Sequence, residues 1–93
     1  MPREAAIVDA IRKALQARGA FVDKDHGGPY QRAGLPDLVA ILDGRTVWIE
    51  CKRPGEIPTP LQRLTLEQIR AAGGHATVAH SVAEALRFVD ELI

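Results

Sequence analysis

Hydrophobic residues at the start of the chain recur at the spacing of a helix. Aliphatic side chains repeat there in steps of three or four residues, namely Ile7, Val8, Ile11 and Leu15. This repeat is typical of a helix that buries one face. Pro2 suits the first turn of such a helix, and Gly19 suits its end. The pattern therefore predicts a helix between these two residues, followed by a short strand over residues 20–24.

Two runs rich in aliphatic residues, 35–42 and 45–52, flank the dipeptide Asp43-Gly44. An Asp-Gly pair between two such runs is typical of a two-residue hairpin turn. We therefore expect two antiparallel strands whose register is fixed by the turn. Residues 26–34, which precede them, are rich in glycine and form the longest irregular stretch of the chain, and such loops often carry function.

The last third of the chain carries signals for a helix, a strand and a second helix. Thr59, Pro60 and Gln62 form a capping box with proline at the first helical position. Residues 75–79 predict a strand, and Ser81 with a Glu three residues later opens the closing helix. The expected inward faces are Leu61, Leu64, Ile69 and Ala72 for the first of these helices, and Val82, Leu86, Val89 and Ile93 for the second.

The order of these elements predicts the fold class. Three consecutive strands favour an antiparallel meander, and the strand-helix-strand unit that follows favours a parallel, right-handed crossover. We expect an α/β fold of order α-β-β-β-α-β-α, with a mixed four-stranded sheet flanked by helices, as one domain over residues 1–93.

Composition excludes several classes of protein. Of the 93 residues, 46% are hydrophobic and 26% are charged, with 12 basic and 12 acidic side chains, so a histone-like basic protein and an acidic disordered tail are excluded. No apolar run approaches the roughly 20 residues of a membrane span, and no apolar signal region follows Met1, which favours the cytosol. A single cysteine excludes an internal disulfide, and His26, His75 and His80 lack the spacing of metal ligands.

Three ionisable side chains lie close together on the predicted hairpin. Counting back from the turn places Asp37 directly opposite Glu50 on one face of the sheet, where two like charges are destabilising. Lys52 points to the same face, because it lies two residues beyond Glu50. A slip of the register by one residue would separate these side chains.

Two opposed carboxylates and a neighbouring ammonium suit a divalent cation. Carboxylate oxygens are ligands that Mg²⁺ and Mn²⁺ prefer, and Mg²⁺ adds waters and phosphate oxygens to them. A lysine beside the ion can orient or deprotonate water and stabilise charge on a phosphate. The pattern favours metal-assisted phosphodiester hydrolysis. The alternative is a hairpin edge with an accidental cluster of charges.

The motifs together resemble a known superfamily. Gly-Leu-Pro-Asp at 34–37 and Glu-Cys-Lys at 50–52 resemble the PD-(D/E)xK nuclease signature. The chain is most similar to the VRR-NUC family, the virus-type replication-repair nucleases, which also has an E-x-K-R-P run as at 50–54 and a Thr-Pro-Leu-Gln helix opening as at 59–62. The resemblance covers about the whole chain and implies a restriction-endonuclease-like core.

The resemblance implies roles for the residues on the hairpin. Asp37 and Glu50 would hold the metal ion, with the main-chain carbonyl of Cys51 as a further ligand. Lys52 would be the catalytic lysine. The family has an aliphatic residue in place of Cys51, whose side chain should pack on the opposite face as a small hydrophobe.

Two further catalytic residues follow from the resemblance, and each has a structural alternative. Gln62 matches the glutamine of the family's helix, although it also completes the capping box. Glu4 matches an acidic residue on the superfamily's first helix and lies in line with the buried stripe of its own helix. An acid in a first turn is also favoured by the helix dipole alone.

Candidate contacts to DNA lie on both sides of these residues. Arg53 and Arg63 flank the motif, and Tyr30 and Arg32 precede it, so all four could contact the phosphate backbone. The alternative for each arginine is an ordinary solvated surface position. Trp48 lies on the Glu50 face, where core packing is expected.

The resemblance implies a Mg²⁺-dependent DNA endonuclease in which Mn²⁺ can substitute, and whose products carry a 5′-phosphate and a 3′-hydroxyl. It implies a homodimer that cuts branched DNA such as four-way (Holliday) junctions, as in phage or bacterial DNA repair. The alternatives are a flap, nick or duplex nuclease that acts with a helicase or other replication protein, and a DNA-binding module without catalysis. We expect it in the cytosol of a bacterium or a phage-infected host.

Overall fold

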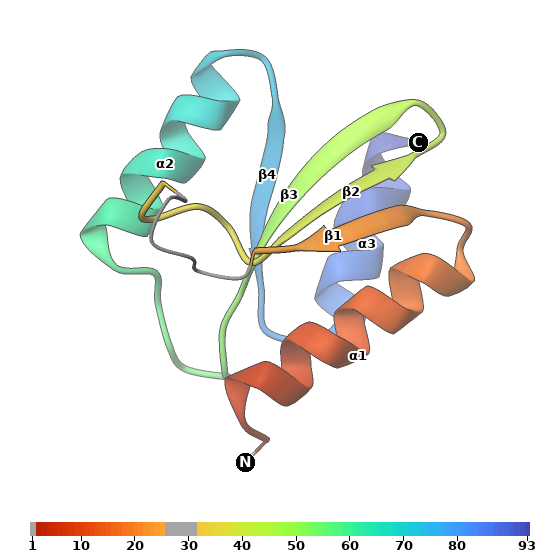
Figure 1. Cartoon of the computed structure of the whole chain (residues 1–93), viewed down its shortest axis with the longest axis horizontal. Coiled ribbons are helices and arrows are strands. Elements are labelled where there is room, and N and C mark those ends of the chain that lie inside the picture. Colours follow the sequence, from red (N-terminus) through yellow and green to blue (C-terminus); the bar gives the residue numbers. More distant parts are fainter. Residues whose placement is uncertain (1, 26–31) are drawn as a thin grey trace.

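The computed structural model describes residues 2–25 and 32–93, and its elements follow the predicted order α-β-β-β-α-β-α (Figure 1). The elements are α1 (Glu4–Ala17), β1 (Phe21–Lys24), β2 (Leu38–Leu42), β3 (Arg45–Cys51), α2 (Pro60–Ala71), β4 (His75–Ala79) and α3 (Val82–Leu92). The prediction of the fold class is confirmed. No helix in the described part of the chain is both long enough and apolar enough to cross a membrane.

The sheet is mixed, with its four strands in the order β1-β2-β3-β4. The first three strands pair antiparallel, and β3 pairs parallel with β4, as the crossover predicts. Asp43 and Gly44 both have positive φ, 51° and 75°, which is the backbone of a type I′ hairpin turn. The register that the turn predicts is confirmed, because Val39 lies opposite Trp48 in the β2–β3 pair.

Strand β2 begins at Leu38, later than the predicted start at residue 35. Pro36 has no N–H to donate to a ladder, and the chain turns away from β3 at this point. The pairing with β3 therefore ends at Leu38 and Ile49, one step before the expected pair of Asp37 with Glu50. Because the β2–β3 pairing stops there, the end of β3 has space beside it for side chains.

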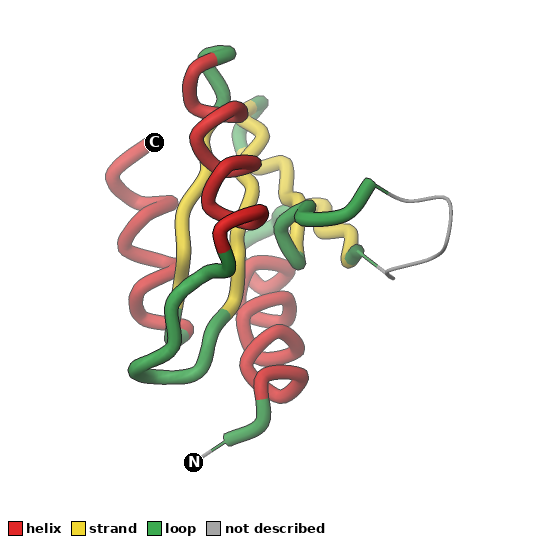
Figure 2. The backbone as a smooth tube through the Cα atoms, turned by 90° about the vertical axis from the view of Figure 1, so that its left-hand side faces the viewer, coloured by secondary structure: helices red, strands yellow, loops and turns green. Residues whose placement is uncertain are grey.

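Helices cover both faces of the sheet. Helices α1 and α3 pack on one face, around the core residues Ile7, Ile11, Leu15, Leu38, Ile49, Cys51 and Val89. Helix α2 lies apart from them and contacts β4, where Leu66 and Ala76 are buried and Arg70 Nε donates to the Ala76 carbonyl at 3.0 Å (Figures 1 and 2). Ala76 pairs with Trp48, so the two side chains lie on the same face of the sheet. Helix α2 therefore covers part of the face that carries Trp48 and Glu50.

The predicted inward face of α2 is wrong at three of its four residues. Leu61 and Leu64 are each 48% exposed and Ala72 is exposed, whereas Ile69 is half-buried and the buried residues are Thr65 and Leu66. The way in which α2 docks beside β4 therefore buries a different stripe of the helix. Thr65 tolerates burial because its hydroxyl donates to the Leu61 carbonyl at 3.1 Å.

Helix α3 differs from its prediction in two details. Its buried residues are Ala85 and Val89, while Ile93 lies beyond the end of the helix and is 55% exposed. Ser81 accepts a hydrogen bond from the Glu84 N–H at 3.2 Å, which confirms half of the predicted capping box. The Glu84 side chain accepts from the main-chain N–H of His80 instead of that of Ser81, so the box is not reciprocal.

Candidate active site

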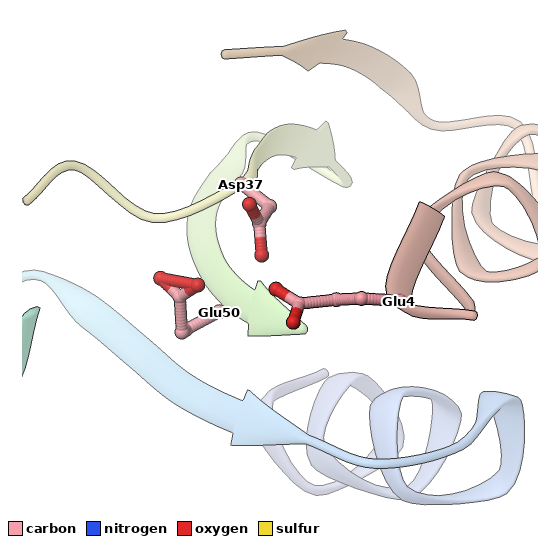
Figure 3. A group of neighbouring side chains, drawn as sticks. All are labelled: Glu4, Asp37 and Glu50. Atoms are coloured by element: carbon pink, nitrogen blue, oxygen red, sulfur yellow. The ribbon is translucent and has the colours of Figure 1, made fainter. Parts of the chain in front are cut away.

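Three carboxylates from distant parts of the chain converge at one end of the sheet (Figure 3). Glu4 comes from the first turn of α1, Asp37 from the residue before β2, and Glu50 from the end of β3. One oxygen of each lies within 4.8 Å of the others. The sequence-predicted pair Asp37 and Glu50 is therefore brought together, and Glu4 joins it.

Main-chain contacts hold Asp37 in place where the β2–β3 ladder stops. Its Oδ2 accepts a hydrogen bond from the Cys51 N–H at 2.8 Å, and its carbonyl accepts one from the Asp25 N–H at 2.8 Å. The side chain of Asp37 thus takes the place that a main-chain carbonyl of β2 would have in a continued ladder. This geometry replaces the predicted ladder pair with Glu50, yet the two carboxylates still meet.

Glu50 is buried, with 1% of its surface exposed, and within the described residues neither carboxylate oxygen has a hydrogen-bond partner. A buried carboxylate without partners is costly to ionise. Burial, together with the neighbouring Asp37 carboxylate, raises the pKa of Glu50 to about 9, although the Lys52 ammonium opposes the shift. One oxygen of Glu50 lies within 4.8 Å of an oxygen of Asp37 and one of Glu4, and such a group of carboxylate oxygens is a donor set that a divalent cation takes.

Lys52 is the cation nearest to these acids among the described residues. Only 7% of its surface is exposed, and its Nζ lies 3.8 Å from Glu4 Oε1. Its main-chain N–H donates to the Ala79 carbonyl at 3.0 Å, which extends the β3–β4 pairing by one bond. The ammonium is therefore fixed beside the three carboxylates.

The side chain and the main chain of Cys51 lie in different surroundings. The thiol is buried in the core under α1 and α3, as predicted, and burial raises its pKa. The N–H of Cys51 points toward Asp37. The N–H and the C=O of one strand residue point to the same side of the strand, so the Cys51 carbonyl is turned toward the same gap.

Gln62 lies in the first turn of α2, and its predicted capping role is confirmed. Its Oε1 accepts from the Thr59 N–H at 2.9 Å, and its own N–H donates to Thr59 Oγ1 at 3.2 Å. The side-chain oxygen is thereby engaged at the start of the helix. A catalytic role for Gln62 stays a prediction.

The predicted contacts to DNA are spread over the surface. Arg32 donates to Gln68 Oε1 at 2.6 Å, and Arg53 forms an ion pair with Glu56. Arg63 is exposed on α2. Tyr30 lies outside the described residues. A role in binding DNA stays a prediction for all four residues of this set.

His80 occupies a position that the sequence did not single out. Its Nδ1 lies 2.9 Å from Glu84 Oε1, and its Nε2 lies 2.9 Å from the Glu56 carbonyl oxygen. The hydrogen bonds to Glu56 and Glu84 raise the pKa of His80. The ring links the segment that follows Lys52 to the start of α3. The four-residue spacing of His80 and Glu84 was the available signal.

Comparisons with known proteins agree with the geometry. No protein-family model matches the chain. A solved structure described as a VRR_NUC domain matches with a TM-score of 0.83 and 25% identity over 97% of each chain. A protein of Acyrthosiphon pisum secondary endosymbiont phage 1, described as "Putative nuclease p44", is 43% identical over 51 residues. That match spans 54% of this chain and 55% of the phage protein, about half of each.

Proposed function

The chain has the VRR_NUC fold over 97% of its length, and from this premise we propose that it is a metal-dependent DNA endonuclease. The observation that carries the proposal is Glu50, whose two oxygens are buried without hydrogen-bond partners among the described residues beside Asp37 and Glu4. A structural carboxylate would be paired, whereas a metal ligand keeps its oxygens free in the protein without the ion.

The residues fit a hard divalent cation. Asp37 and Glu50 would hold it, with the Cys51 carbonyl as a third ligand and Glu4 at the open side. All four donors are oxygens, which favours Mg²⁺, with Mn²⁺ able to replace it. When bound, the ion supplies Lewis-acid stabilisation of the negative charge on the phosphate.

The protein's own groups supply the remaining chemistry. Lys52 Nζ lies beside the carboxylates, where it orients the attacking water and donates to the phosphate oxygens as negative charge develops. The carboxylates hold Lys52 in turn, through the contact with Glu4. Gln62 supports the site from the start of α2. Water would attack phosphorus as the P–O3′ bond breaks and the leaving 3′-oxygen takes up a proton, which gives the 5′-phosphate and 3′-hydroxyl that the family resemblance implies.

The proposed substrate is branched DNA, such as a four-way junction, cut by a homodimer in the course of DNA repair. A junction has two-fold symmetry, and two symmetric nicks need two sites, which a C₂ dimer supplies. Phe21 and Ile41 are large apolar residues that pair across β1 and β2 and are 66% and 46% exposed, which supports an interface with another chain. Residues 1–93 act as one nuclease domain, in the cytosol of a bacterium or a phage-infected host.

Cleavage of matched substrates tests this proposal. Purified protein with Mg²⁺ should cut a four-way junction faster than a flap or a linear duplex of the same sequence. EDTA and Asp37→Ala should each abolish cutting, while Glu67→Gln, at an exposed position on α2, should leave the rate unchanged. Equal cutting of linear duplex would favour the alternative, a flap, nick or duplex nuclease with a helicase or replication partner. DNA binding without cutting would point to a non-catalytic module.

A further inference from the structure

A cavity of about 160 Å³ lies on the same face of the sheet as Glu50, one step along the strands. Its apolar walls are Leu35, Pro36, Val39 and Trp48. Trp48 is only half-buried, which corrects its expected place in the core. The cavity thus has an aromatic side chain in an otherwise aliphatic wall, and the proposed metal site does not account for it.

Two wall residues of the cavity are close neighbours in sequence of the carboxylates. Pro36 in its wall precedes Asp37, and Trp48 precedes Glu50 by two residues, a distance of about 7 Å along a strand. This separation is similar to that between a phosphate and the base of its own nucleotide. A strand whose phosphate lies at the carboxylates can therefore place a neighbouring base in the cavity.

The charged groups at the rim select the kind of occupant. Asp23, Lys24 and Asp25 line it, and Asp23 pairs with the wall residue Val39, whereas the Lys24 side chain alternates to the opposite face of the sheet. A carboxylate at the rim disfavours a phosphate and favours a group that donates hydrogen bonds. Asp23 is held in position, because its Oδ1 accepts from the Lys24 N–H at 3.0 Å. Nucleobases combine flat apolar faces with amino donors at the edge, so they match both the walls and the rim.

We propose that this cavity binds one unpaired DNA base next to the scissile phosphate, stacked on Trp48 with its amino edge toward Asp23. The inference rests on the proposed nuclease function and narrows its substrate. A base stacked inside a continuous duplex cannot enter the cavity, whereas a base at a branch or a single-stranded end enters without the cost of unpairing. The cavity would thus select branched DNA over plain duplex at each single site.

Trp48 is the only tryptophan of the chain, so its fluorescence reports directly on the cavity. The probe is a flap oligonucleotide in Ca²⁺, with an abasic nucleotide moved one position at a time through the unpaired strand. Intact DNA should quench Trp48, and one abasic position should weaken binding about tenfold or more, as expected for one stacked base. Trp48→Phe should keep this position dependence, and Trp48→Leu should lose it.

The outcomes separate this inference from the proposed function. Unchanged Trp48 fluorescence, with equal affinity at every abasic position, would overturn the base site even if the protein cuts DNA. A fluorescence change on dilution of the protein alone would also overturn it, since a second copy would then fill the cavity. Position-dependent binding by a protein that cuts no substrate would support the base site and refute the nuclease.

Discussion

Glu50→Gln should make the metal-free protein more stable at neutral pH, although it removes a proposed metal ligand. The wild-type carboxyl is buried and has a pKa raised to about 9, chiefly by burial and then by Asp37. In the unfolded chain the same group has its ordinary pKa, near 4.5. An amide has no charge to bury and can donate to the Asp37 carboxylate.

The size of the effect follows from proton linkage. Between pH 4.5 and about 9 the folded state holds one more proton than the unfolded state, so stability falls as pH rises through this window. The slope for a single group is about 1.4 kcal/mol per pH unit. From pH 5.5 to pH 7.5 the wild type should therefore lose about 3 kcal/mol that Glu50→Gln does not lose.

Urea unfolding in EDTA at several pH values measures this difference. Other titrating groups are common to both proteins, so subtracting the two curves isolates residue 50. Glu67→Gln, on the exposed surface of α2, serves as the matched control and should follow the wild type at every pH. A gap between wild type and Glu50→Gln that stays constant from pH 5.5 to 7.5 would refute the argument, because Glu50 would then ionise as an ordinary glutamate.

Three further predictions concern metal, pH and packing. Mg²⁺ at 100 times its dissociation constant should raise the free energy of unfolding by about 3 kcal/mol. Calorimetry in buffers of different ionisation enthalpy should show that Glu50 releases a proton when the ion binds. The absence of a Mg²⁺-dependent shift in Tm would contradict the proposed metal site. Because the pKa of His80 is raised in the folded state, the stability that its protonated ring contributes is complete below pH 6.5 and is lost as pH rises through the higher folded pKa. His80→Gln should remove this part of the pH dependence and cost about 1 kcal/mol at pH 6. Thermal unfolding measures the loss, with His75→Gln as the control. Leu66→Ala should cost about 2–5 kcal/mol in urea unfolding, because Leu66 is 2% exposed. Leu64→Ala should cost less than about 1 kcal/mol, and a loss as large as that of Leu66→Ala would mean that Leu64 is buried, as the sequence predicted.

The hairpin and the carboxylate pair could be predicted because short-range rules determine them. Asp43-Gly44 fixes the turn, the turn fixes the register, and the register brings Asp37 toward Glu50. Glu4 lies in line with the buried stripe of its own helix, but the residues alone left the helix dipole as an equal explanation, and the family resemblance supplied its role. The pairing of the strands needed only neighbours in sequence and a counted register, whereas Glu4 needed the resemblance.

Features that depend on how elements dock escaped prediction. Leu61 and Leu64 are apolar at helical spacing, but the position of α2 over β4 decides that Thr65 and Leu66 are the residues that meet the sheet. The bond from the Cys51 N–H to Asp37 arises only where β2 leaves β3. The cavity at Trp48 likewise needs walls from three separate segments, which no local pattern specifies.

The docking of α1 makes the group of three carboxylates depend on a helix that contributes none of them. Glu4 reaches the other carboxylates only when α1 is packed in place, and α1 shares its core with α3, made of residues 82–92. Without α3, part of that core would be open to water and α1 would be held less firmly against the sheet. An ion bound by the three carboxylates would in turn tie α1 to β2 and β3, so the proposed site and the packing of α3 would stabilise each other.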